Sequence, residues 1–243
     1  MLSPINGAPT CPPLTLRFDA SANPLPIRSI RMPQPPARLP LSGAPPWHLT
    51  GPADQAFDFC GHVHRLLEDI VVRCEALDHV KMSRILLGVT QARSVGSHGL
   101  QARVTPLRFP RGQLVRRRRG VLYQVQRYFL DEREFLYLMT FCLPRFLDQE
   151  FDEKFITLFH ELYHISPACD GDLRRHHSRY ALHSHSRHGY DRHMADLARC
   201  YLAAKPDPAL HAFLRLDFAQ LQARHGAVAG IVVPRPKIVP VAE

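Results

Sequence analysis

The stretch Phe159-His160-Glu161-Leu162-Tyr163-His164-Ile165 contains the pattern H-E-x-x-H within a run that reads as an α-helix. Residues four apart on a helix lie nearly one above the other, about 6 Å apart along the axis. The imidazoles of His160 and His164 can therefore converge on one ion at the roughly 2.0–2.1 Å that zinc–nitrogen bonds require. Glu161 points in a neighbouring direction, from which a general base can reach a metal-bound water. The spacing predicts a zinc site on this helix.

The residues around the motif predict a buried helix. We expect it to begin with Asp148 as N-cap and to end at Ser166, where Pro167 stops it. Apolar residues occupy nearly its whole circumference: Phe155, Ile156, Leu158, Phe159, Leu162, Tyr163 and Ile165. Two histidines and a glutamate on such a helix are costly unless they are paired or bind a metal. The pattern therefore favours a metal site over histidines that hydrogen-bond within the core.

The elements on either side indicate the fold class. Apolar residues from Phe57 to Leu77 recur at helical spacing and predict one long amphipathic helix. Four β-type runs follow, separated by turn signals, at about 84–92, 100–109, 121–129 and 135–143. Further helices are expected at about 189–204 and 208–224, the last with Gly226 as C-cap. We predict an α+β fold, in which a small, mostly antiparallel sheet packs with the long N-terminal helix, the H-E-x-x-H helix and the C-terminal helices.

Proline content divides the chain. The first fifty residues hold 12 of the 22 prolines and no sustained hydrophobic period, so residues 1–51 are expected to form a flexible arm. Residues 52–228 are expected to form the folded domain. Residues 229–243, which include three prolines, are expected to be an extended tail.

Composition excludes several classes of protein. With 243 residues, of which 45% are hydrophobic, the chain is long enough to bury a core and is not disordered throughout. It has no apolar run of membrane-spanning length, and residues 1–21 lack the layout of a secretory signal, so a cytoplasmic location without membrane contact is expected. The six cysteines are scattered without a C-x-x-C pair, which argues against a disulfide framework and against thiolate zinc knuckles.

A catalytic zinc needs a third protein ligand and one open position. Eight of the 15 histidines lie between residues 160 and 193, so the supply is ample, but the residues alone do not single one out. Asp170, Asp172 and Asp191 are candidates for carboxylates that orient zinc-bound histidines. A solvated turn with Arg174 and Arg175 explains the first two equally well. Three tyrosines could donate to an oxyanion, although packing roles are favoured for each: Tyr163, Tyr180 and Tyr190.

The chain also resembles a known family. Pro106-Leu107-Arg108-Phe109, Leu143-Pro144-Arg145-Phe146-Leu147 and His160 to Pro167 are similar to segments of a family of bacterial and phage metallopeptidases. Asp170 to Arg175 and Tyr190-Asp191 continue the resemblance, which covers roughly residues 55–205. It implies a zinc-dependent hydrolase that acts on peptides.

The resemblance also implies a third ligand and a place for the substrate. His183, in His183-Ser184-His185-Ser186, is the implied ligand, with His185 as its close rival. Asp170 is a further alternative, because it lies six positions beyond His164, where metzincin-like enzymes have their third ligand. However, Pro167 stands where those enzymes use glycine. In zincins a sheet edge near the metal helix binds extended substrate, and the strand at 135–143 is the nearest in sequence.

The predicted function is hydrolysis of peptide bonds in a peptide or protein substrate. Zn²⁺ would activate a water, and Glu161 would take its proton and deliver it to the leaving amine. One alternative is a module that zinc stabilises without catalysis. Another is a nucleic-acid-associated protein, because the net charge is +9 and Arg116 to Arg119 form a basic run. A solvated turn between two strands is the simpler interpretation of that run, so nucleic acid is not the favoured partner.

Overall fold

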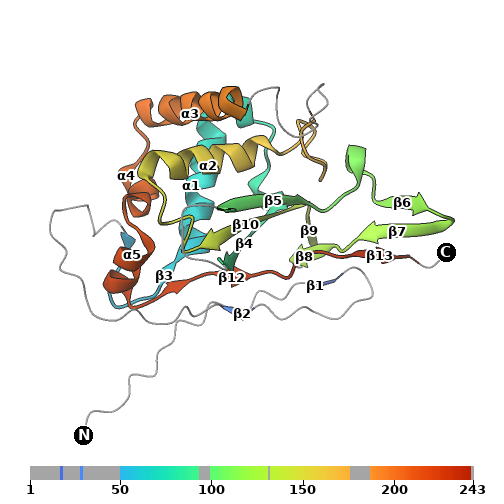
Figure 1. Ribbon diagram of the computed structural model, residues 1–243, viewed down its shortest axis with the longest axis horizontal. Helices are drawn as coiled ribbons and strands as arrows, with labels where there is room; N and C mark the ends of the chain where they lie inside the picture. Colours follow the sequence, from blue (N-terminus) through green and yellow to red (C-terminus); the bar gives the residue numbers. More distant parts are fainter. Residues whose placement is uncertain are drawn as a thin grey trace, which may run out of the picture.

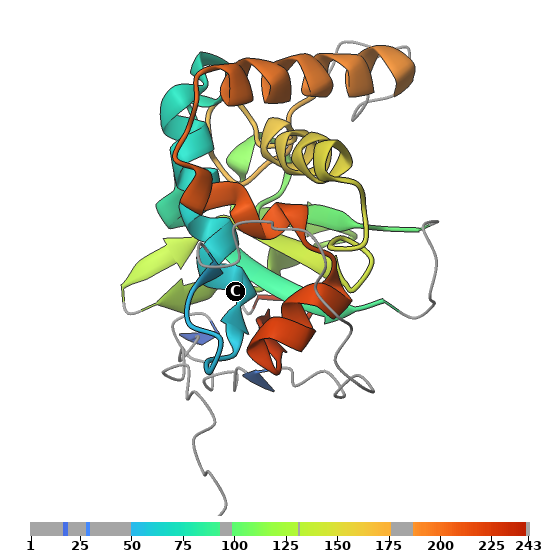
Figure 2. The same cartoon turned by 90° about the vertical axis from the view of Figure 1, so that its left-hand side faces the viewer.

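The computed structural model describes residues 17–18, 28–29, 50–92, 99–130, 132–175 and 187–241. Helices and small sheets are combined, which confirms the mixed α and β class at this level. Figures 1 and 2 show a layered arrangement, in which helix α2 (Phe151–Tyr163) lies between helix α3 (Arg187–Ala203) and a central sheet. The H-E-x-x-H helix is therefore an inner element of the molecule.

The central sheet has three strands in the order β4-β10-β5. They span Ile85–Gln91 (β4), Tyr137–Leu143 (β10) and Ala102–Pro106 (β5). β10 pairs in parallel with β4, with Tyr137 opposite Ile85, and antiparallel with β5, with Met139 opposite Val104. The expectation of a mostly antiparallel sheet was therefore wrong for the central sheet, because hairpin spacing in the sequence does not exclude a crossover that returns the chain parallel to β4.

Both faces of this sheet are covered. One face packs with α1 and α2 in the main core, which includes Met139 and Phe141 of β10. The other face, with Leu86 and Leu138, packs against a smaller cluster that includes Tyr128 and Val233. Strands buried on both sides read as continuous apolar runs, as β4 and β10 do in the sequence.

The N-terminal helix α1 spans Phe59–Arg73. It begins where Asp58 Oδ1 accepts a hydrogen bond from Gly61 N at 2.9 Å, and it ends at Cys74, whose backbone is extended. Phe57 lies instead in the short strand β3 (Phe57–Asp58), and Leu77 lies in a 3₁₀ turn over Glu75–Leu77. Both residues are buried, so they continue the apolar pattern of the sequence without continuing the helix.

The boundaries of α2 differ from those expected. Glu150 is the N-cap and forms a reciprocal capping box with Glu153, whereas Asp148 accepts from Phe218 N at 3.2 Å. The helix ends at Tyr163 with His164 as C-cap, and Ile165 already pairs with Leu173 in an isolated β-bridge. The helix therefore ends before Ser166, and the chain reverses direction over residues 166–172, which include Pro167.

The C-terminal helices are shorter than the periodicity suggested. The helix expected over 208–224 is divided into α4 (Pro208–His211), a 3₁₀ turn (Ala212–Arg215) and α5 (Phe218–His225). The break occurs because Asp217 caps a new helix, accepting from Gln220 N at 2.7 Å. Gly226 follows α5 in the left-handed conformation at φ 72°, as expected for a C-cap.

Four small sheets accompany the central one in the described part of the chain. Strands β6 (Val115–Arg118) and β7 (Val121–Val125) form a hairpin that extends away from the helices (Figure 1). β13 (Ile238–Pro240) pairs with β7, so the expected extended tail is partly held in a sheet. β8 (Tyr128–Leu130) and β9 (Arg133–Phe135) pair with each other. β11 (Val228–Ala229) pairs with β3, and β12 (Ile231–Val232) precedes β13.

Most of the proline-rich arm lies outside the described residues. Its two described pieces, β1 (Arg17–Phe18) and β2 (Arg28–Ser29), pair with β8 and β12. In the described part of the chain, no helix is long and apolar enough to cross a membrane. The five described cysteines are free thiols, and three of them, Cys60, Cys142 and Cys169, are buried.

Candidate metal centre

His160 and His164 lie side by side on the last turn of α2. Their ring centroids are 4.6 Å apart, and the ring planes meet at 82°. Two imidazoles bound to one tetrahedral zinc have ring centres about 5 Å apart, since each zinc–nitrogen bond is about 2.1 Å long. Both side chains are half-buried, so solvent can reach the pair. The two rings therefore fit the spacing that a shared metal ion demands.

Glu161 is buried beside this pair, with 7% of the residue exposed. Its Oε2 accepts a hydrogen bond from the backbone nitrogen of Val104 on β5 at 2.7 Å. Burial raises the pKa of the carboxyl to about 7, although the bond from Val104 and the charge of Arg103 act in the opposite direction. A carboxyl with a pKa in this range can both take up and release a proton near neutral pH.

Tyr190 covers the two histidines from the start of α3. Its ring centroid lies 4.9 Å from that of His160 and 5.9 Å from that of His164, nearly parallel to the latter at 24°. The residue is buried, and burial is the main reason why the pKa of its hydroxyl is raised far above the usual value. Packing of α3 on α2 thus restricts the rotation of both imidazoles.

Asp191 lies on the same side as His160. Its Oδ1 is 4.0 Å from His160 Nδ1, and about half of its side chain is exposed. A carboxylate at the Nδ1 side favours the tautomer that leaves Nε2 free for a metal. The structure therefore places Asp191 where the sequence analysis expected an orienting carboxylate.

Asp170 and Asp172 hold the loop after α2 and are not grouped with the two histidines. Asp170 Oδ1 accepts from Ser166 Oγ at 2.6 Å. Asp172 accepts from Arg111 N at 2.8 Å and forms an ion pair with Arg175. Burial opposes ionisation of Asp172, but these donors outweigh it and lower the pKa of the carboxyl. Asp172 has the arginine partner Arg175 that the alternative of a turn expected, whereas Asp170 bonds to Ser166.

Arg174 closes the C-terminal end of α2. Its backbone nitrogen donates to His164 O at 2.7 Å, and its Nε donates to Tyr163 O at 2.9 Å. The guanidinium lies over the Tyr163 ring, 4.1 Å from the centroid, and its Nη2 is 3.2 Å from His79 Nε2. A cation at a helix C-terminus satisfies carbonyls that have no partner within the helix. Arg174 therefore fixes the turn that carries His164.

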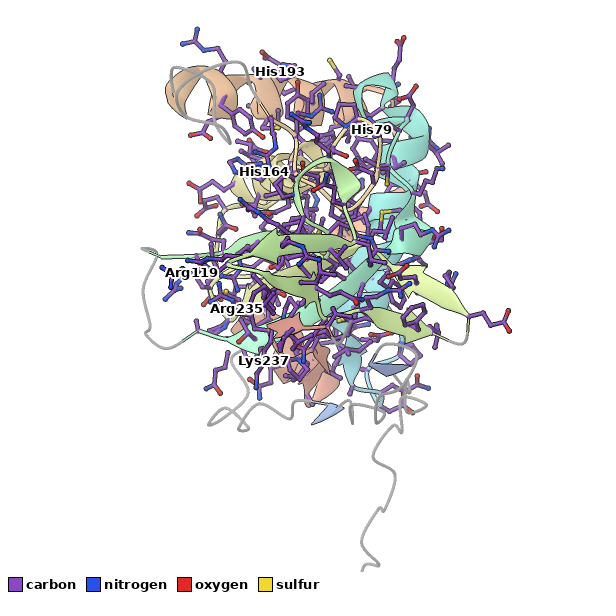
Figure 3. All side chains as sticks on the ribbon, turned by 90° about the vertical axis from the view of Figure 1, so that its right-hand side faces the viewer. His79, Arg119, His164, His193, Arg235 and Lys237 are labelled. Carbon is purple, nitrogen blue, oxygen red and sulfur yellow. The ribbon has the colours of Figure 1, made fainter. Side chains whose placement is uncertain are left out.

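Among the described side chains, none joins His160 and His164 to make a set of three candidate ligands. The segment that contains His183 and His185 lies outside the described residues, as do the side chains of His176, His177 and His188. His193 is exposed on α3 and contacts Tyr163 at a centroid distance of 5.4 Å (Figure 3). Among the residues that the structure describes, no group of three or more His, Cys, Asp or Glu side chains could hold a metal.

The strand nearest to the helix in sequence is not at the sheet edge. β10 is the middle strand, so the expectation that it could bind extended substrate was wrong. In the described sheet the edge beside α2 is β5, whose Val104 already contacts Glu161. Sequence order misled because β5 precedes β10 by about thirty residues yet pairs with it.

Several residues of the site carried no signal in the sequence. Val104 contributes its backbone, which any residue has, and Lys154 is buried on the same helix with its Nζ bonded to Leu214 O and Leu216 O, both at 2.9 Å. Lysine is seldom fully buried in proteins, so the sequence offered no reason to expect this position inside the core. Comparison of the chain with models of protein families, with curated proteins and with solved structures finds no match.

Proposed function

We propose that the chain is a zinc-dependent metallopeptidase whose metal is held by His160 and His164. The observation that carries this proposal is the edge-to-face pair of imidazoles, 4.6 Å apart, with the buried carboxylate of Glu161 on the same turn. A zinc ion bound there would polarise a peptide carbonyl and lower the pKa of a bound water toward about 7.

Glu161 is proposed as the general base. Its Oε2 already accepts from Val104 N, so Oε1 is the oxygen that would receive the proton from the attacking water. The same carboxyl would then deliver that proton to the leaving amine, which must be protonated before it departs. The backbone bond from β5 holds the carboxylate in one orientation during both transfers.

Tyr190 and Asp191 are proposed as positioning residues. Tyr190 packs on both imidazoles, and Asp191 lies 4.0 Å from His160 Nδ1. His183 is the proposed third ligand, with His185 and Asp170 as rivals. The hydrogen bond between Asp170 and Ser166 argues against the last of these, because it commits one carboxylate oxygen elsewhere.

The test combines metal analysis with hydrolysis of a mixed peptide library by the full chain. The wild-type protein should contain about one zinc per chain, and His160→Ala or His164→Ala should lose it. His193→Ala, which changes an exposed histidine of α3, is the matched control and should retain the metal. Glu161→Gln should keep the zinc and lose hydrolysis, because an amide cannot accept the proton.

The main alternative is a zinc site without catalysis. It predicts that the wild-type protein retains zinc and unfolds when the metal is removed, yet cleaves no peptide in the library. If Glu161→Gln still hydrolysed peptides, Glu161 would not be the general base. If both His160→Ala and His164→Ala retained zinc, the proposed metal site would be wrong.

A further inference from the structure

The hairpin β6–β7 and the C-terminal strand β13 form the most basic part of the described surface. Arg116, Arg117 and Arg118 belong to β6, and Arg119 forms the turn, all of them exposed. Pairing of β13 with β7 adds exposed Lys237, which immediately precedes β13, and exposed Arg235. Figure 3 shows Arg119, Arg235 and Lys237 in the same region of the view. Segments more than one hundred residues apart in the sequence thus contribute to one basic surface.

The chain segments that form this surface contain no acidic residue. Residues 106–130 and 226–242 contain neither aspartate nor glutamate. In the described part of the chain, none of Arg116, Arg118, Arg119, Arg235 and Lys237 forms an ion pair. The neighbouring Arg108 and Arg127 differ, because both bind Glu134, at 2.7 Å and 2.6 Å. These five cations, which have no ion pair in the described part of the chain, are therefore available to an external anion.

The register places these cations on both faces of the ribbon. Alternate residues of a strand point to opposite faces, so Arg116 and Arg118 share one face with Tyr123, which lies opposite Arg116. Arg117 points to the other face, with Leu122 opposite. Lys237 lies on this second face as well, because its carbonyl accepts from Gln126 N in line with the β7–β13 ladder. A flat anionic surface would contact only one of the two faces.

In the turn between β6 and β7, an arginine adopts a backbone conformation that is unfavourable for a long side chain. Arg119 has φ 50° and Gly120 has φ 82°, the pair of positive values that a two-residue hairpin turn requires. Asparagine or aspartate is the usual residue at the first of these positions, because a long side chain there is disfavoured. Arg119 therefore places a positive charge at the tip of the hairpin, between its two faces, in addition to the charges of Arg116, Arg117, Arg118 and Lys237.

We propose that this hairpin binds double-stranded nucleic acid by entering a groove, with phosphates of the two strands contacted from its two faces and its tip. The hairpin forms two strands of the three-stranded sheet β13-β7-β6, and a sheet with side chains on both faces is about 10 Å thick. The major groove of B-DNA is about 12 Å wide, so the sheet can enter it with its tip foremost. The charged side chains of this surface are all arginine or lysine, so we expect contacts to phosphate to dominate and binding to depend little on sequence. This activity is separate from peptide hydrolysis.

The first experiment measures retention of a random-sequence DNA duplex by the full chain at several salt concentrations. One variant combines Arg116→Gln, Arg118→Gln and Arg119→Asn. The matched control combines Arg65→Gln, Lys81→Gln and Lys205→Asn, which also removes three exposed charges and places asparagine at a left-handed position, φ 49°. The slope of log K against log salt should weaken by about 3 in the hairpin variant and remain unchanged in the control. Equal slopes in the two variants would overturn the proposal.

The second experiment tests entry into a groove. Lys237→Gln on one face and Arg118→Gln on the other should each weaken the slope by about 1, because both faces contact phosphate. A change in only one of them would overturn the groove model. Tighter binding of single-stranded than of double-stranded DNA would also overturn it, as would retention on phosphatidylserine vesicles with no duplex binding. Thermal unfolding of each variant shows that the change in slope is not a loss of fold.

Discussion

The backbone nitrogen of Val104 donates a 2.7 Å hydrogen bond to the carboxylate of Glu161. The bond joins the glutamate of the H-E-x-x-H motif to strand β5, which is the edge of the described central sheet beside α2. The proposed general base is thus held by the main chain of an element that the motif does not include. Changes to Glu161 are expected to affect stability as well as chemistry.

Replacement of Glu161 separates these two effects. Glu161→Leu removes the acceptor and leaves the Val104 N–H without a partner, so the free energy of unfolding should fall by about 1–3 kcal/mol. Glu161→Gln keeps an acceptor oxygen and should change stability much less. Urea unfolding of metal-free protein measures both variants. Equal losses for leucine and glutamine would show that the bond to Val104 contributes nothing.

Asp191 is expected to strengthen metal binding through His160. Asp191→Ala should lower the affinity for zinc by about 10–100-fold, because the imidazole loses the carboxylate that favours its metal-binding tautomer. Asp196→Ala, on the same helix, is the control, since Asp196 pairs with Arg199. Competition with a chelator gives the two affinities. If both variants bind zinc as tightly as the wild-type protein, Asp191 has no positioning role.

Lys154 should make stability depend on alkaline pH. Burial lowers its pKa to about 8, whereas the unfolded chain keeps the ordinary value of 10.5. Between these values the unfolded chain binds a proton that the folded chain has released, so the free energy of unfolding rises with pH by up to about 3 kcal/mol. Lys154→Met should abolish this rise. Denaturant unfolding at pH 7, 8, 9 and 10 gives the difference between the two proteins, and parallel curves would contradict the prediction.

Glu134 should support stability at neutral pH and lose that effect in acid. Arg108 and Arg127 both donate to its carboxylate; burial opposes ionisation, but the two guanidiniums outweigh it and hold the pKa below the ordinary 4.5. Its stabilisation is therefore complete above about pH 4.5 and is lost as the pH falls through the lowered value.

Two substitutions test the ion pairs of Glu134 with Arg108 and Arg127. Glu134→Gln should lower the free energy of unfolding at pH 7 by about 1–3 kcal/mol, because two partly buried guanidiniums lose their shared anion. The difference from the wild-type protein should shrink as the pH falls below 4.5. Glu132→Gln, an exposed neighbour, serves as the control and should change stability little. A constant difference at every pH would contradict the assignment.

Patterns within short stretches of the sequence predicted the helices and strands whose formation depends mainly on neighbouring residues. The helix that carries His160 and His164 follows from 3.6-residue periodicity, and the four β-type runs coincide with observed strands. The helix ends were less accurate, because Glu150 rather than Asp148 caps α2, and Asp217 caps a separate helix within the one expected over 208–224. Capping depends on which backbone groups are already paired elsewhere.

The sequence by itself determined the mixed class of the fold, the helix with His160 and His164 four residues apart and the run of four arginines. It did so because residues at fixed spacing on one helix or one strand have fixed relative positions. Only the tertiary structure decided that β10 lies inside the sheet, that Val104 binds Glu161, that Tyr190 covers both histidines and that Lys237 joins the arginine hairpin. Each of these contacts joins elements distant along the chain, and their pairing depends on how the whole core packs, which no local spacing encodes.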